Sequence, residues 1–199
     1  MQLIMKNHTF TLWPLMLLVL AAVLIAQWRI THSAPRVIFS AIFGLYLLVL
    51  IDKVFFPLPV MAGPGAWFRE PGRWPLLVRS MNLVPFRFSA ADPGLRHLMA
   101  RRVVENVLMT IPFGFGVGFV ADIQRRQVWW VAPAVGFALE GIQLALSLLV
   151  GGAYRTVDVN DVLLNALGVL IGYGVFLAFG WFVVWAVARR GVEPRGVVG

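Results

Sequence analysis

Cysteine is absent from this chain of 199 residues, so disulfide bonds and thiolate metal sites are excluded. Histidine is scarce as well. His8, His32 and His97 are too far apart in the sequence to form a metal-binding motif, and no metal site is expected. Charged residues make up 13% of the chain, whereas an average soluble protein has about 25%. This shortage of charge excludes an ordinary soluble protein.

Apolar residues take the place of the missing charge. Hydrophobic residues are 60% of the chain and the mean hydropathy is +0.82, values typical of an integral membrane protein. The apolar runs predict an all-α bundle of about five transmembrane helices, at 11–27, 37–56, 103–120, 128–150 and 162–187. No repeat divides the sequence, so residues 1–199 are expected to form a single membrane domain.

The first apolar run has features of both a signal peptide and a membrane helix. The small residues Ser33 and Ala34 resemble a cleavage site, but Pro35 follows them directly. Trp13 and Trp28 lie near the two ends of the run, where tryptophans anchor a helix at the membrane interfaces. We therefore expect this run to be the first transmembrane helix.

A long connection, rich in proline, glycine and arginine, spans residues 58–102 between the second and third predicted helices. Trp67, Phe68 and Trp74 lie among arginines there, a mixture that suits the lipid headgroup layer. The NLVPF motif at 82–86 predicts a packed turn, because its proline favours extended geometry in the preceding residue. We expect the connection to be interfacial or extracytoplasmic.

The net charge is +8, from seventeen lysines and arginines against nine acidic residues. The basic residues are spread between the predicted helices, which favours membrane lipid as a partner and argues against nucleic acid. With the long connection set aside, the side that carries Arg189 and Arg190 is the more basic. The positive-inside rule then predicts a cytoplasmic C-terminus and an outward-facing connection.

Polar residues occur at helical spacing inside the last apolar segments. They are Glu140, Gln143, Arg155, Asp158, Asp161 and Asn165. The first two are three residues apart and the others follow at steps of three, three and four, which predicts one polar stripe if the segments are helical. An ionisable group at membrane depth costs roughly 3 kcal/mol on insertion scales, so such groups normally face a protein interior or a wet cavity. We interpret this stripe as a candidate ligand-binding site.

The sequence allows alternative partners for Glu140 and Arg155. Glu140 is expected either to pair with an arginine or to keep its proton. Arg155 is expected either to pair with Asp158 or to reach an anionic headgroup. Asp52 and Lys53, at the end of the second helix, are predicted to form a pair at the membrane interface.

Glycines in the last three predicted helices predict close packing. Gly168 and Gly172 are four residues apart, a spacing that lets two membrane helices approach closely. Gly114 and its neighbours in the third helix predict the same, and the Gly151–Gly152 pair is expected to end the fourth helix. The amide of Asn106 needs a partner near the membrane.

Four motifs occur in a fixed order along the chain: NLVPF at 82–86, ENVLMTIPFGF at 105–115, Glu140 with Gln143, and the run from Arg155 to Gly168. On these motifs, residues 40–175 resemble the VanZ-like family, small bacterial membrane proteins named after a teicoplanin resistance factor. The resemblance implies a multi-pass protein of the bacterial inner (cytoplasmic) membrane. It also implies that Asn82 and Asn106 belong to the site, with the polar stripe of the last helix as the nearest partner of Asn106. The ligand class that it implies is a glycopeptide or a lipid-linked cell-wall precursor.

Three functional hypotheses follow. The first is a protein that contributes to glycopeptide or lipoglycopeptide resistance, or to envelope homeostasis, by binding an amphiphilic or lipid-linked ligand in an outward-facing pocket; Arg155 would hold its phosphate or carboxylate. The second is a membrane enzyme for a lipid-linked phosphate, with Asp158 and Asp161 as acid, base or metal ligands. No serine or histidine nucleophile lies beside them, so no catalytic residue or cofactor is assigned. The third is a structural or interaction protein without a ligand.

Overall fold

The computed structural model describes residues 12–58, 63, 65–70, 72–86, 93–121 and 123–189. Within these ranges there are five helices long and apolar enough to cross a membrane. They are α1 (Trp13–Thr31), α2 (Ala34–Phe55), α5 (Pro93–Val120), α6 (Val128–Val150) and α7 (Val159–Arg189). The chain is therefore an all-α, multi-pass membrane protein, as its hydropathy predicts.

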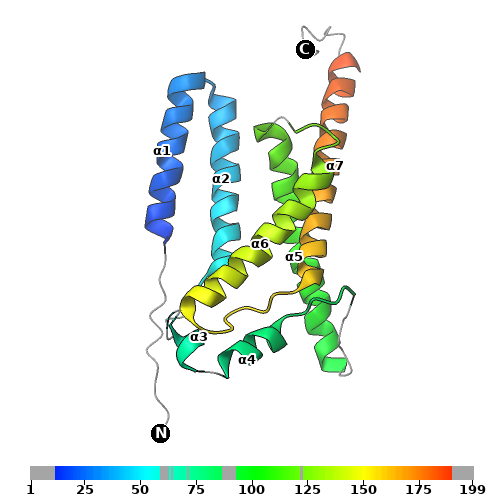
Figure 1. The fold of residues 1–199 in the computed structure, drawn as a ribbon. Coiled ribbons are helices and arrows are strands. Elements are labelled where there is room, and N and C mark those ends of the chain that lie inside the picture. Colours follow the sequence, from blue (N-terminus) through cyan, green and yellow to red (C-terminus); the bar gives the residue numbers. More distant parts are fainter. Residues whose placement is uncertain are drawn as a thin grey trace.

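The five long helices form two groups (Figure 1). α1 and α2 stand side by side as a hairpin, while α5, α6 and α7 pack together, with α6 tilted across the other two. α5 and α6 each pack mainly against α7, and the hairpin contacts the rest chiefly through α2. α7 is therefore the helix around which the bundle is built.

Some predicted helix ends differ from those in the structure. α6 begins and ends where its apolar run does, but α5 begins at Pro93 rather than at Val103, and α7 extends to Arg189. Hydropathy marks the part of a helix that suits lipid, whereas arginines such as Arg101 and Arg102 favour a helical backbone as well. The helix therefore continues beyond its apolar part.

Close approach between α5 and α7 depends on glycine, as the spacing predicts. A side chain on Gly168 would collide with the backbone carbonyl of Val107, and one on Gly172 with that of Ile111. Gly114 of α5 faces the backbone of α7 in the same way. Such contacts between backbones are possible only where no Cβ intervenes, and in lipid they are a main source of helix association.

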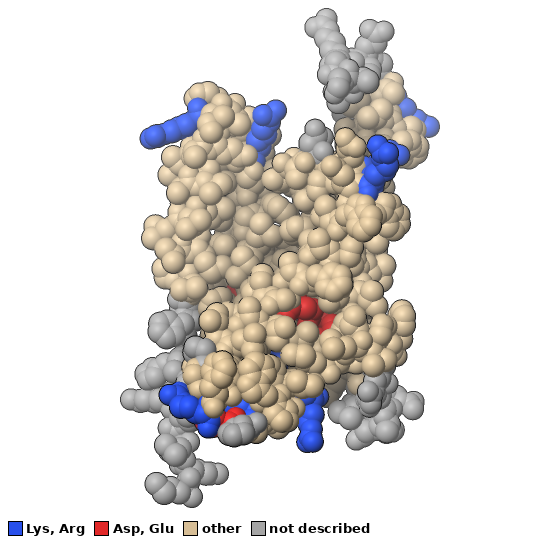
Figure 2. All heavy atoms as spheres, in the orientation of Figure 1, with Lys and Arg blue, Asp and Glu red and all other residues tan. Residues whose placement is uncertain are grey.

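Two short helices, α3 (Ala66–Arg69) and α4 (Arg73–Ser80), lie at one end of the bundle (Figure 1). Trp67 is buried and its indole Nε1 donates a hydrogen bond of 2.8 Å to the carbonyl of Leu148 in α6. Between the two helices, the hydrogen bond from the Arg73 guanidinium to Glu70 holds the pKa of that carboxyl below its usual range. Basic side chains gather near both ends of the molecule (Figure 2).

Asp52 and Lys53 do not pair with each other. Asp52 accepts a hydrogen bond of 3.0 Å from the indole Nε1 of Trp13, whereas the Nζ of Lys53 lies 3.8 Å from a carboxylate oxygen of Glu105. Adjacent residues in a helix point in directions about 100° apart, so each reaches a different neighbouring helix. The prediction of a local pair at the interface is therefore wrong, because tertiary neighbours supply the partners.

Candidate functional site

The NLVPF motif and the segment that joins α6 to α7 are hydrogen-bonded to each other. The joining segment begins at Gly151, which ends α6 in the left-handed conformation with φ of 77°. The backbone N–H of Asn82 donates to the carbonyl of Val157, and that of Val159 donates to the carbonyl of Asn82, both at 2.9 Å. This parallel bridge confirms that the motif is a turn and not a helix, and it fixes the turn against the start of α7.

Asp158 caps the N-terminus of α7. Its Oδ1 accepts hydrogen bonds from the backbone N–H of Asn160 at 2.8 Å and from the Nδ2 of Asn82 at 2.9 Å. An aspartate in this position satisfies an N–H group that the first helical turn leaves without a partner. The spacing predicts a continuous helical stripe through Arg155 and Asp158 if the segment is helical. This stripe is not found, because the helix begins only at Val159.

Asn160 completes the attachment of the turn and was not identified in the sequence. Its side-chain Oδ1 accepts a hydrogen bond of 2.7 Å from the backbone N–H of Phe86, and the residue is buried. The Asp-Val-Asn-Asp sequence at 158–161 is typical of a helix start, with a capping aspartate and a second acid in the first turn. That signal would have located the first turn of α7.

Glu140 is buried in α6, with 5% of its surface exposed, and its Oε2 accepts a hydrogen bond of 3.0 Å from the backbone N–H of Asp158. Within the described ranges, the ion pairs involve Glu70 and Glu105 as the acids, so Glu140 has no basic partner there. Of the two expected states, pairing with an arginine is therefore not found. The carboxyl instead ties α6 to the segment before α7.

Asn106 joins α5 to α7, as predicted. Its Nδ2 donates a hydrogen bond to Oδ1 of Asp161. One turn further along α5, the hydroxyl of Thr110 is fully buried and lies 2.9 Å from the carbonyl oxygen of Asn165. Asn165 itself is 2% exposed, and its Oδ1 has no hydrogen-bond partner in the described structure. Asn165 thus belongs to the helix interface and not to an open site.

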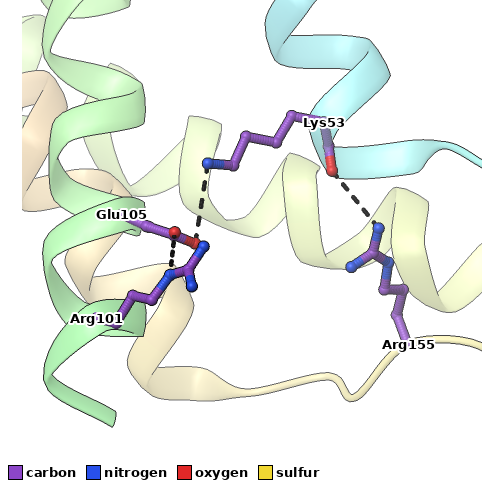
Figure 3. A network of polar contacts seen from close by, with 4 residues as sticks. All are labelled: Lys53, Arg101, Glu105 and Arg155. Carbon is purple, nitrogen blue, oxygen red and sulfur yellow. Dashed lines mark hydrogen bonds and ion pairs between the residues drawn. The ribbon is translucent and has the colours of Figure 1, made fainter. Parts of the chain in front are cut away.

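Arg155 reaches the C-terminal end of α2 (Figure 3). Its Nη2 lies 3.5 Å from the carbonyl oxygen of Lys53 and 3.4 Å from that of Phe56. These carbonyls lie where a helix end leaves oxygen atoms without intrahelical donors. Across the same space, Glu105 accepts a hydrogen bond of 2.8 Å from Nε of Arg101 and pairs with Lys53. Within the described residues, Arg155 is not paired with Asp158.

A polar cavity of about 150 Å³ lies between α2, α5, α6, the segment before α7 and the first turn of α7. Its lining residues are Lys53, Val54, Arg102, Glu105, Asn106, Met109, Gln143, Arg155, Thr156 and Asp161. A smaller cavity of about 40 Å³ lies against the capping residues Asp158 and Asn160. Arg102 and Asp161 line both cavities.

The structure brings together only part of the predicted site. Of the eight residues proposed from the sequence, four line the larger cavity: Asn106, Gln143, Arg155 and Asp161. Asp158 lines the smaller one, whereas Asn82, Glu140 and Asn165 line neither. Lys53 and Arg102 were not predicted to belong to the site. Arg102 lies one helical turn before Asn106 on the same face of α5, a spacing that could have identified it.

The larger cavity is lined by more cationic than acidic side chains. Lys53, Arg102 and Arg155 contribute cationic side chains, against the two acids Glu105 and Asp161. Amides of Asn106 and Gln143 add neutral hydrogen-bonding groups, and Gln143 donates a bond of 3.3 Å to the carbonyl of Val54. In the described part of the chain, no group of three His, Cys, Asp or Glu residues could hold a metal ion.

The sequence matches a known protein family. A family model described as VanZ/LLP1 matches residues 43–183, a range that contains all residues of both cavities. No curated protein and no solved structure matches the chain.

Proposed function

The chain belongs to the VanZ/LLP1 family, and we propose that it is a bacterial inner-membrane protein that binds the anionic headgroup of an amphiphilic or lipid-linked ligand. Through this binding it contributes to glycopeptide or lipoglycopeptide resistance, or to envelope homeostasis. The headgroup occupies the cavity of Lys53, Arg102 and Arg155, which opens to the outer face of the membrane.

The observation that carries this proposal is the gathering of three cationic side chains around one cavity inside a membrane bundle. Charges at membrane depth are costly unless they have partners, so such a cluster normally serves a ligand or a network. Part of it is a network, because Lys53 pairs with Glu105 and Arg155 binds carbonyls of α2. Arg102 is different: its side chain is exposed, and it has no ion pair in the described structure.

The size of the cavity also fits a headgroup. Water occupies about 30 Å³ per molecule in the liquid, so a cavity of about 150 Å³ accommodates a phosphate or carboxylate with several waters. An arginine guanidinium binds either group through two parallel hydrogen bonds, which favours Arg102 as the principal contact. In this respect Arg102 takes the role that the sequence suggests for Arg155.

An apolar surface lies beside the smaller cavity, which Asp158 and Asn160 line. In the turn that is bonded to Asp158 and Asn160, Leu83, Val84 and Phe86 are all exposed. Such residues are unfavourable in water and suit either lipid or the apolar part of a bound molecule. The combination of a cationic cavity and an apolar turn therefore supports an amphiphile over a small soluble anion.

The proposal is tested with Arg102→Ala, and Arg79→Ala serves as the control, because Arg79 is exposed at the same end of the molecule and lines neither cavity. We expect Arg102→Ala to weaken binding of a polyprenyl phosphate by about tenfold or more, the loss typical of a charge-assisted hydrogen bond. Arg79→Ala should bind as the native protein does. Binding is measured on purified protein, and teicoplanin susceptibility is measured in cells that express each variant.

Equal binding by the Arg102 and Arg79 variants would contradict the proposal. Hydrolysis of the polyprenyl phosphate that depends on a divalent ion would instead support the membrane-enzyme hypothesis. If the native protein binds no ligand and Arg102→Ala only lowers the melting temperature, the cluster is structural and the third hypothesis is favoured.

A further inference from the structure

A third cavity lies at the other end of the bundle, between the α1–α2 hairpin and the end of α5. Its volume is about 600 Å³, and its lining includes Gln27, Arg36, Phe39, Ser40 and Phe119. At this end the hairpin stands apart from the other three long helices (Figure 1), and the surface is hollowed between the two groups (Figure 2). The cavity is therefore separate from the site of Lys53 and Arg102.

The lining of this cavity changes from basic at the end of the helices to aromatic one turn deeper. Arg36 lies in the first turn of α2 with an exposed side chain, so its charge is at the end of the membrane span. Phe39, one turn deeper, packs against Phe119 of α5 with ring centroids 4.7 Å apart. A cation at the membrane surface above an aromatic wall matches the order of phosphate and acyl chains in a phospholipid.

Two observations indicate that side chains around this cavity lack protein partners among the described residues. α1 contains no buried residue, although hydrogen bonding and packing attach it to α2. At the cavity wall, the Oε1 of Gln27 is buried and accepts no hydrogen bond from the described residues. An amide oxygen without a partner at membrane depth is unfavourable.

We infer that this cavity binds one anionic phospholipid, with its phosphate at Arg36 and the upper part of its acyl chains against Phe39 and Phe119. The lipid fills the space between the hairpin and α5 and holds the hairpin in place. Residues 27–40 precede the segment 43–183 that matches the family model. The site is thus built largely from this chain's own N-terminal part, and it is independent of the proposed headgroup site at the other end.

The test compares Arg36→Ala with Arg29→Ala, because Arg29 is also exposed at this end but does not line the cavity. Purified protein is titrated with phosphatidylglycerol, and the first binding event is followed by native mass spectrometry. We expect Arg36→Ala to weaken it by about fivefold, as for one basic residue near an anionic lipid. The Arg29 variant should keep native affinity, and phosphatidylcholine should bind more weakly than phosphatidylglycerol.

A second variant, Ser40→Phe, fills the cavity and keeps both arginines. It should exclude the lipid without changing the helical content measured by circular dichroism. Equal losses in the Arg36 and Arg29 variants would overturn the inference, since they would indicate diffuse attraction to surface charge. Native affinity in both Arg36→Ala and Ser40→Phe, or equal affinity for the two lipids, would overturn it as well. If Ser40→Phe does not fold, the comparison of the two arginines decides.

Discussion

At the scale of single residues, the acids near the start of α7 are held by neutral donors. Glu140 accepts from a backbone N–H, Asp158 from a backbone N–H and an amide, and Asp161 from the amide of Asn106. Because hydrogen bonds satisfy these carboxyls without a cation, the bonds can persist if a carboxyl is replaced by an amide of the same shape. The charge and the geometry of each acid can therefore be separated by mutation.

Asp161 offers the clearest separation. Asp161→Asn keeps an oxygen that accepts the hydrogen bond from Asn106, so we expect a change of less than about 1 kcal/mol in the free energy of unfolding. Asp161→Leu removes the acceptor and should cost about 1–3 kcal/mol. We further expect Asp161→Asn to bind the polyprenyl phosphate at least as tightly as the native protein, since the substitution removes a negative charge from the cavity that Arg102 and Arg155 line.

Stability is measured by denaturation in detergent, and binding by titration of purified protein with the polyprenyl phosphate. Weaker binding by a stable Asp161→Asn variant would contradict the anion site, because it would show that the negative charge supports binding. A variant as unstable as Asp161→Leu would show that the charge, and not the hydrogen bond, supports the fold.

At the scale of elements, the contact between α5 and α7 determines where the site residues meet. Gly168 and Gly172 allow the backbones of these helices to touch. Asn106 and Asp161 meet at the same interface, and Asp161 lies about two to three turns before these glycines in α7. Separating the two helices would therefore lengthen the hydrogen bond that closes one wall of the cavity. Packing in the helix interface and geometry in the site are coupled.

Gly172→Ala tests this coupling against Gly174→Ala, two residues further along the same helix. An added Cβ at Gly172 collides with the carbonyl of Ile111, whereas nothing lies within 4 Å of one at Gly174. We expect the first substitution to destabilise the bundle by about 1–3 kcal/mol. The second should be neutral or stabilising by up to about 1 kcal/mol, because alanine is the better helix former. Melting temperatures in detergent give the comparison, and equal values for the two variants would contradict the close packing.

At the scale of the whole molecule, both proposed sites depend on its orientation in the membrane. The cavity of Lys53 and Arg102 and the helices α3 and α4 lie near one end, while the hollow beside Arg36 lies near the other. Basic residues occur at both ends (Figure 2), so charge alone gives only a modest preference. The proposed role in resistance requires the first end to face outward.

Single cysteines resolve the orientation, because the native chain contains none. We expect Ser80→Cys, at the end of α4, to react with an impermeant thiol reagent added to intact cells. Gln127→Cys, before α6 and at the opposite end, should react only after the membrane is permeabilised. The reverse pattern would place the proposed headgroup site in the cytoplasm and would exclude direct contact with an extracellular antibiotic.

The sequence by itself determined the class of the protein and much of its local structure. Apolar runs identified five membrane helices, because only segments of mostly apolar residues with a hydrogen-bonded backbone are stable in lipid. Glycine spacing indicated the packed face of α7, and Pro85 indicated the turn at 82–86. All these properties depend on residues that are close together in the chain.

Only the tertiary structure decided which polar groups meet. Asn82 binds Asp158 from 76 residues away, and Arg155 reaches the carbonyl of Lys53 across 102 residues. Helical spacing placed Arg155 and Asp158 on one stripe, but the bridge to Asn82 holds that segment extended and makes Asp158 a helix cap. It likewise took the packing of α2 against α5 to bring Lys53 to the same cavity as Arg102. Periodicity gives the direction of a side chain from its own helix, whereas its partner is fixed by how separate helices pack.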